Sequence, residues 1–134
     1  MDRRPLLMVA PEMTVFEAAR KMQEKQCGAV LIVRDERLIG IFTERDAVFR
    51  VMAQGRDPRS TLLADVMTAS PKTIGPERSL GYAMILMHEN GFRHMPVVDD
   101  GRPIGLVSAR NALDPELEEF VSESQRREYI RKGG

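Results

Sequence analysis

The sequence is poor in the residues that build covalent cross-links and stacking surfaces. It has one cysteine, no tryptophan, two tyrosines and five phenylalanines in 134 residues. Because Cys27 is alone, the chain forms no intramolecular disulfide and holds no cysteine-cluster metal site, and we expect no metal. These absences favour a reducing compartment, and we expect a cytoplasmic protein.

Charge of one sign and long apolar runs are also lacking. Twenty basic and twenty acidic residues give a formal net charge of zero. This balance argues against a nucleic-acid partner, because binding to phosphates requires a basic excess on one face. The longest apolar run, residues 29–33, is too short to cross a membrane. Residues 1–5 have no apolar stretch behind them, so we expect no signal peptide.

What the sequence does contain is an internal repeat. Residues 40–47 return with conservative changes as residues 105–112, and this 65-residue offset holds without a gap from position 11 to position 48. Such a long common register indicates a tandem duplication, so each half-site has a relative in the other half. The positions with identical partners are, in the first copy, Pro11, Glu12, Ala18, Met22, Glu24, Val33, Arg37, Ile39, Gly40, Arg45 and Ala47.

Each copy has the same predicted order of elements, β-α-β-β-α, which gives an α/β (α+β) fold of two repeats. The expected strands are 6–9, 28–33 and 38–42 in the first copy and 73–74, 95–98 and 104–107 in the second. Asp100-Gly101 is a strong hairpin signal. We place the first repeat with its linker at 6–60, the second repeat at 61–114, and a C-terminal helix and tail at 115–134.

Hydroxyl residues mark the start of every predicted helix. Thr14 and Glu17 have the spacing of a capping box, and apolar residues behind them recur at helical intervals. In the second copy Ser79 takes the capping position, but Tyr82 stands where Glu17 did, so the box is incomplete. Thr43 and Ser108 are expected to cap the last helix of each repeat.

These features carry a family resemblance. Two repeats that each end in Gly-apolar-apolar-Thr/Ser-x-x-Asp/Asn resemble a tandem pair of cystathionine β-synthase (CBS) domains. Residues 93–99 and 65–68 also resemble the strand and the lead-in of that family, and the likeness covers 6–114. The resemblance implies two repeats on a pseudo-twofold axis, a homodimer and a free-standing regulatory module. It also implies an adenosyl ligand such as AMP, ADP, ATP, NAD or S-adenosylmethionine, in clefts between the repeats, and a regulated protein whose identity is unknown.

The chemistry of the Thr/Ser-x-x-Asp motif fits such a ligand. A strand gives way to a helix at Thr43, where free backbone N–H groups and the helix dipole favour a phosphate. One turn later, Asp46 can accept the hydroxyls of a ribose. Gly40 and Gly105 allow a close approach of backbone, because neither has a Cβ. The same motif is also a plain helix cap with an acidic third residue, and this alternative stays open.

Further ligand contacts are implied by the resemblance. Arg45 and Arg110 recur beside the motif and either neutralise phosphate or are solvated helix residues. Asn111 replaces the acid of the second motif, so the second pocket is expected to be weaker, altered or empty. The base of the ligand would meet the first residues of the apolar strands and the entry strands, namely Gly28, Ala29, Val30, His94, Met95, Pro96, Val9, Thr73 and Ile74.

The sequence therefore predicts a regulatory module that binds an adenine nucleotide and is not an enzyme. An enzyme would need a nucleophile with a base or a metal constellation, and the sequence offers no catalytic set. The alternative function is a ligand-independent dimerisation or interaction module. No cofactor is expected to be required, so the nucleotide would act as a regulatory ligand.

Overall fold

The computed structural model describes residues 6–109, in which contacts group the chain into two compact units. The first unit extends to Pro71 and also includes the turn residues 101–103, and the second unit takes up the rest from Lys72. The predicted helix after Ser108 and the C-terminal helix at 115–134 lie outside the described residues.

The first unit has the predicted β-α-β-β-α order, followed by a short helix and strand. Its sheet order is β1-β2-β3-β4, with β1 parallel to β2 and the other neighbours antiparallel. The elements are β1 (Met8–Val9), α1 (Val15–Lys25), β2 (Ala29–Arg34), β3 (Arg37–Thr43), α2 (Glu44–Asp46), the π-helix η1 (Ala47–Met52), α3 (Leu63–Val66) and β4 (Thr68–Ala69).

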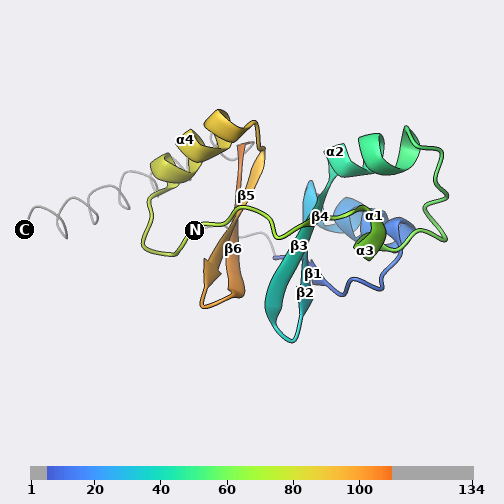
Figure 1. The fold of residues 1–134 in the computed structure, drawn as a ribbon, viewed down its shortest axis with the longest axis horizontal. Coiled ribbons are helices and arrows are strands. Elements are labelled where there is room, and N and C mark those ends of the chain that lie inside the picture. The colour runs from blue at the N-terminus through green and yellow to red at the C-terminus, as the bar shows by residue number, and fades with distance from the viewer. Residues whose placement is uncertain (1–5, 110–134) are drawn as a thin grey trace, which may run out of the picture. The chain divides into compact units, whose positions relative to one another are not determined.

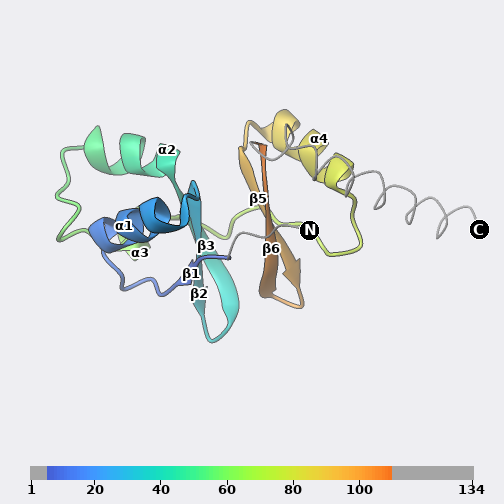
Figure 2. The same ribbon diagram turned by 180° about the vertical axis from the view of Figure 1, so that it is seen from behind.

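The helices of the first unit lie on one face of its sheet (Figure 1, and from behind in Figure 2). Period-2 alternation directs Val30, Ile32 and Phe42 to this face, where they pack with α1, η1 and α3. The opposite face of β2 is buried too, since Ala29 and Leu31 are inaccessible. Burial on both faces explains why this strand reads as an unbroken apolar run.

The second unit repeats the same plan. It contains α4 (Leu80–Asn90), β5 (His94–Asp99) and β6 (Arg102–Ser108), and β5 and β6 form a two-stranded sheet. Instead of the expected entry strand at 73–74, Ile74 forms a single parallel bridge with Val97. Ile74, Ala83, Met87 and Met95 form the buried cluster of this unit.

Matching hydrogen bonds confirm the duplication at atomic level. Thr14 Oγ1 accepts from the Glu17 N–H at 3.2 Å, and Ser79 Oγ accepts from the Tyr82 N–H at 3.1 Å. The predicted caps of α1 and α4 are therefore present. The Thr14 hydroxyl also lies 3.3 Å from Glu17 Oε1, a contact for which Tyr82 provides no counterpart.

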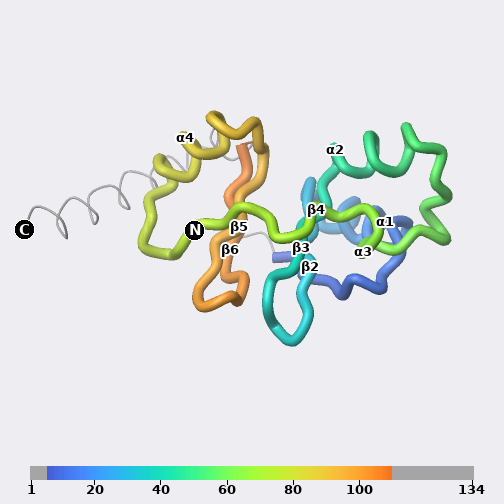
Figure 3. Tube along the Cα trace, in the orientation of Figure 1, coloured from blue at the N-terminus to red at the C-terminus, as the bar shows by residue number. Residues whose placement is uncertain are grey.

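The connection between the repeats packs on the first unit. Figure 3 traces this segment from the end of η1 through α3 to β4. Leu63 and Val66 enter the core of the first unit, as expected for apolar residues in the linker. A Cβ at Gly40 would collide with the Met67 side chain and lie 3.2 Å from the Thr68 carbonyl oxygen. The close approach that Gly40 permits is thus made by this connecting segment.

Both hairpins turn through two residues in left-handed conformation. Asp100 and Gly101 have φ of 52° and 81°, and Asp35 and Glu36 have φ of 53° and 68°. Positive φ at both central positions is the requirement of a type I′ turn. Glycine meets this requirement without steric cost, but Glu36 has a Cβ and does not.

This difference predicts that Glu36→Gly stabilises the first unit relative to Glu36→Ala. Both variants lose the same carboxylate, and only glycine relieves the left-handed backbone, which costs roughly 1–2 kcal/mol for an L-residue. Part of this gain is offset by the larger entropy of glycine in the unfolded chain, about 0.5–1 kcal/mol. Urea denaturation should place the midpoint of the glycine variant above that of the alanine variant; coincident midpoints would contradict the assignment.

Candidate functional site

The candidate site is built on the turn from β3 into α2. Thr43 is the last residue of β3 and has extended backbone, with φ −117° and ψ 169°, so the helix begins at Glu44. The Glu44 N–H donates to the Gly28 carbonyl at 3.0 Å, which fixes the start of the helix against the start of β2. The equivalent bond in the second repeat joins the Ala109 N–H to the Arg93 carbonyl at 2.9 Å.

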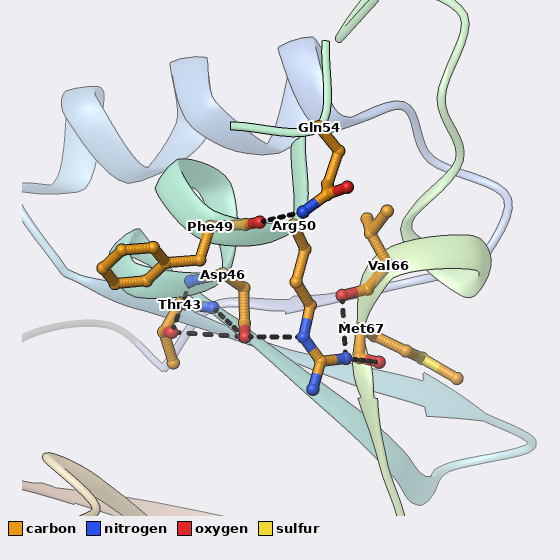
Figure 4. Close-up of polar contacts among 7 residues, drawn as sticks. All are labelled: Thr43, Asp46, Phe49, Arg50, Gln54, Val66 and Met67. Atoms are coloured by element: carbon orange, nitrogen blue, oxygen red, sulfur yellow. Dashed lines mark hydrogen bonds and ion pairs between the residues drawn. The ribbon is translucent and has the colours of Figure 1, made fainter. Parts of the chain in front are cut away.

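Thr43 and Asp46 form a complete capping box (Figure 4). Thr43 Oγ1 accepts from the Asp46 N–H at 3.2 Å, and Asp46 Oδ2 accepts from the Thr43 N–H at 3.0 Å. The Thr43 hydroxyl also lies 3.1 Å from Asp46 Oδ2. The helix-cap interpretation of the motif is therefore confirmed.

The capping box changes what is available to a ligand. We expected free N–H groups at this helix start, but the amides of Glu44 and Asp46 both have acceptors inside the protein. The phosphate-binding capacity expected of this helix start is correspondingly smaller. The hydroxyl of Thr43 and the carboxylate of Asp46 contact each other, so a ligand that uses one of them affects the other.

Arg50 joins the site from the next turn of the helix, and the sequence analysis did not identify it. Its Nε lies 3.4 Å from Asp46 Oδ1, and its Nη1 lies 3.0 Å from the Met67 carbonyl oxygen and 3.4 Å from that of Val66. An acid four residues before a base on a helix is a recognisable ion-pair signal. The spacing of Asp46 and Arg50 therefore contained the information needed to find this contact.

Arg45 points to a different group. Its guanidinium carbon lies 5.5 Å from the centre of the Phe49 ring, a cation–π distance. Both residues are exposed, with Phe49 at 56%. Neither the phosphate role nor the solvated role expected for Arg45 accounts for this ring contact.

The strand residues predicted to meet the base are near Thr43, but their side chains are mostly inward. Ala29 pairs with Thr43 in the sheet, and Val30 pairs with Phe42. Ala29, Val30 and Val9 are buried, and the last two belong to the core cluster. Contacts from these positions to a ligand would involve backbone atoms, of which those of the half-buried Gly28 are the most accessible.

In the second repeat the predicted residues are only partly described. Met95, Pro96 and Ile74 are buried, while Thr73 is exposed. His94 and Ser108 are half-buried at the start of β5 and the end of β6. Arg110 and Asn111 lie outside the described residues.

Two searches for other kinds of site gave negative results within residues 6–109. No group of three or more His, Cys, Asp or Glu side chains there is arranged to hold a metal ion. None of the helices in that range has the length and apolar character needed to cross a membrane.

Comparison with protein families places the chain among known folds. The model of the CBS domain matches it twice, at residues 1–53 and 63–115. The chain is 36% identical over 126 residues to the CBS domain-containing protein CBSX3, mitochondrial, of Arabidopsis thaliana. That match covers 90% of this chain but 61% of the relative, so the chain spans about three-fifths of the relative's length.

Solved structures with the same fold are also similar. A putative signal-transduction protein with CBS domains from Burkholderia ambifaria superposes with a TM-score of 0.77 at 35% identity, over 86% of this chain and 85% of that one. The CBS domain protein PAE2072 from Pyrobaculum aerophilum, complexed with AMP, has a TM-score of 0.76 at 20% identity. Its match covers 92% of this chain and 95% of that chain.

The capping box predicts that Asp46→Ala destabilises the first unit. The change removes the acceptor of the Thr43 N–H and the partner of Arg50, and loss of a helix cap typically costs about 1 kcal/mol. Glu44→Ala is the matched control, because Glu44 is an exposed acid in the same helical turn. Urea denaturation should show a clearly larger loss for Asp46→Ala; equal losses would mean that the box does not stabilise the fold.

Proposed function

The chain belongs to the CBS domain family, and we propose that its pair of CBS domains binds an adenine nucleotide as a regulatory ligand, without catalysing a reaction. The observation that carries the proposal is the Thr43–Asp46 pair at the turn from strand to helix. The Asp46 side chain is 12% exposed, so its carboxylate is largely shielded yet reachable. Partial burial strengthens a hydrogen bond to a ribose hydroxyl, because water competes less.

The proposed ligand is AMP or a related adenosine compound. The AMP complex of PAE2072 supports this chemistry within the same fold. We assign Asp46 to the ribose, Thr43 and Arg45 to the phosphate, and the backbone at Gly28 to the base. Ser108, Arg110 and Asn111 would act in the same way in the second repeat, with an amide in place of the carboxylate.

A ligand-independent interaction module is the second candidate. It is favoured by the capping box itself, because Thr43 and Asp46 already satisfy each other without a ligand. The two candidates differ in a measurable property, namely whether changing Asp46 to its uncharged amide alters the affinity for a nucleotide.

We propose in addition that the protein is a homodimer that acts on a regulated partner protein. The helix formed by α2 and η1 presents Val48, Phe49 and Met52 to solvent, with Met52 72% exposed. On α4, Tyr82 and Ile85 are exposed where the first repeat has the charged residues Glu17 and Arg20. Exposed apolar side chains at these densities are typical of protein interfaces.

Light scattering should therefore return the mass of a dimer at micromolar concentration. Phe49→Glu should shift the mass towards the monomer, because a charge in an apolar interface is strongly unfavourable. Glu17→Lys, on the charged face of α1, is the control for a simple change of surface charge. A monomeric wild type would remove the proposal of a homodimer.

Reciprocal exchange of the motif residues tests nucleotide binding. Asp46→Asn gives the first repeat the amide of the second, and Asn111→Asp gives the second repeat the acid of the first. Because charge-assisted hydrogen bonds exceed neutral ones by about 1 kcal/mol, Asp46→Asn should weaken AMP binding about five- to tenfold. Asn111→Asp should strengthen or create a second site.

Isothermal titration calorimetry of the wild type and both variants measures these effects. The AMP recovered from the cell should be unchanged, since no reaction is proposed. AMP binding that is equal in all three proteins would place the ligand elsewhere. No binding of AMP, ADP, ATP, NAD or S-adenosylmethionine to the wild type would favour the interaction module.

A further inference from the structure

The two oxygens of Asp46 have different surroundings. Oδ2 lies within hydrogen-bond distance of both donors of Thr43, its N–H at 3.0 Å and its hydroxyl at 3.1 Å. A carboxylate oxygen has two lone pairs, so Oδ2 is saturated by the capping box. Oδ1 is the oxygen that remains for a ligand, and it faces Arg50 Nε at 3.4 Å.

The capping box alone orients the carboxylate, because two donors on Oδ2 fix the plane of the group. Arg50 is therefore not needed to hold Asp46 in place. Its guanidinium instead occupies one of the two acceptor directions of Oδ1. A ribose that presents two neighbouring hydroxyls to Asp46 needs both of these directions, and it must compete with Arg50 for one of them.

Arg50 also contacts the segment that connects the repeats. Its Nη1 donates to the carbonyl oxygens of Val66 and Met67 at the end of α3 (Figure 4). This is the segment whose Met67 side chain is seated on Gly40 and whose next residues form β4. One guanidinium thus joins the free oxygen of Asp46 to the main chain that leads towards the second repeat.

We propose that Arg50 is a positioning residue that competes with the ribose for Asp46 Oδ1 and links nucleotide binding to the segment from Val66 to Ala69. This inference rests on the proposed function. When a ribose takes Oδ1, Arg50 withdraws from it, and its bonds to the carbonyls of Val66 and Met67 rearrange. The 65-residue offset places Pro115 at the equivalent position, so the link belongs to the first repeat alone.

Calorimetric titration of the wild type and Arg50→Ala with AMP and with 2′-deoxyadenosine 5′-monophosphate tests the competition. A half-exposed ion pair contributes up to about 1 kcal/mol, so removing Arg50 should tighten AMP binding about two- to fivefold. The deoxy compound has one hydroxyl fewer and should gain less. The ratio of the two affinities should therefore rise in the variant.

Two further variants make the result specific. Arg56→Ala removes the same charge from an exposed position just after the same helix, and both affinities should stay at their wild-type values. Arg50→Gln shortens the side chain and removes the charge while keeping an amide donor, and it serves if the alanine variant does not fold. Hydrogen exchange at the amides of residues 67–70 reports on the connecting segment.

In the wild type, AMP should speed exchange at residues 67–70, and in Arg50→Ala exchange should be fast already and unaffected by AMP. A merely structural role of Arg50 would change exchange but leave the ratio of the two affinities unaltered, and this outcome overturns the inference. AMP binding that Arg50→Ala leaves equal or weakens overturns it as well. No AMP binding to the wild type overturns the proposed function and, with it, this inference.

Discussion

The hydrogen-bonded turn at Thr43 fixes the end of β3, the start of the helix and the distance between them. The Glu44 N–H reaches back to Gly28 at the start of β2, and the capping box closes the first turn of the helix. Asp46 is then in place to meet Arg50, which reaches the carbonyls of Val66 and Met67. Each of these contacts requires the previous one, so the connection between the repeats depends on the geometry of one strand-to-helix turn.

This arrangement gives folding and the proposed binding the same atoms. The hydroxyl and the carboxylate that cap the helix are the groups that a nucleotide would use, and they contact each other at 3.1 Å. A ligand at Thr43 and Asp46 therefore exchanges hydrogen bonds with the fold and adds few new ones. Its net free energy is the difference between similar terms, which favours weak, reversible binding over tight retention. Such a site suits a regulatory ligand whose concentration varies.

The order of elements could be predicted because it depends on local signals. The helix caps at Thr14, Ser79 and Thr43 and the Asp100-Gly101 turn are each encoded within four residues. The role of Arg50 toward Val66 and Met67 spans 16 and 17 residues and depends on how α3 packs, so no local pattern contains it. The i→i+5 bond from the Ala53 N–H to the Val48 carbonyl, which widens the helix into η1, likewise has no sequence pattern that predicts it.

The packing of α3 and β4 on the first unit has a consequence for dissecting the protein. The repeat detected by sequence and the unit that packs together end at different places, since the second family match begins at residue 63 while the first unit extends to Pro71. A fragment cut at the sequence boundary would leave the core of the first unit without Leu63 and Val66, two of its buried members. The shortest piece of the first repeat that retains all its own core residues therefore includes the chain as far as Pro71, and these residues are best regarded as structure borrowed from the join.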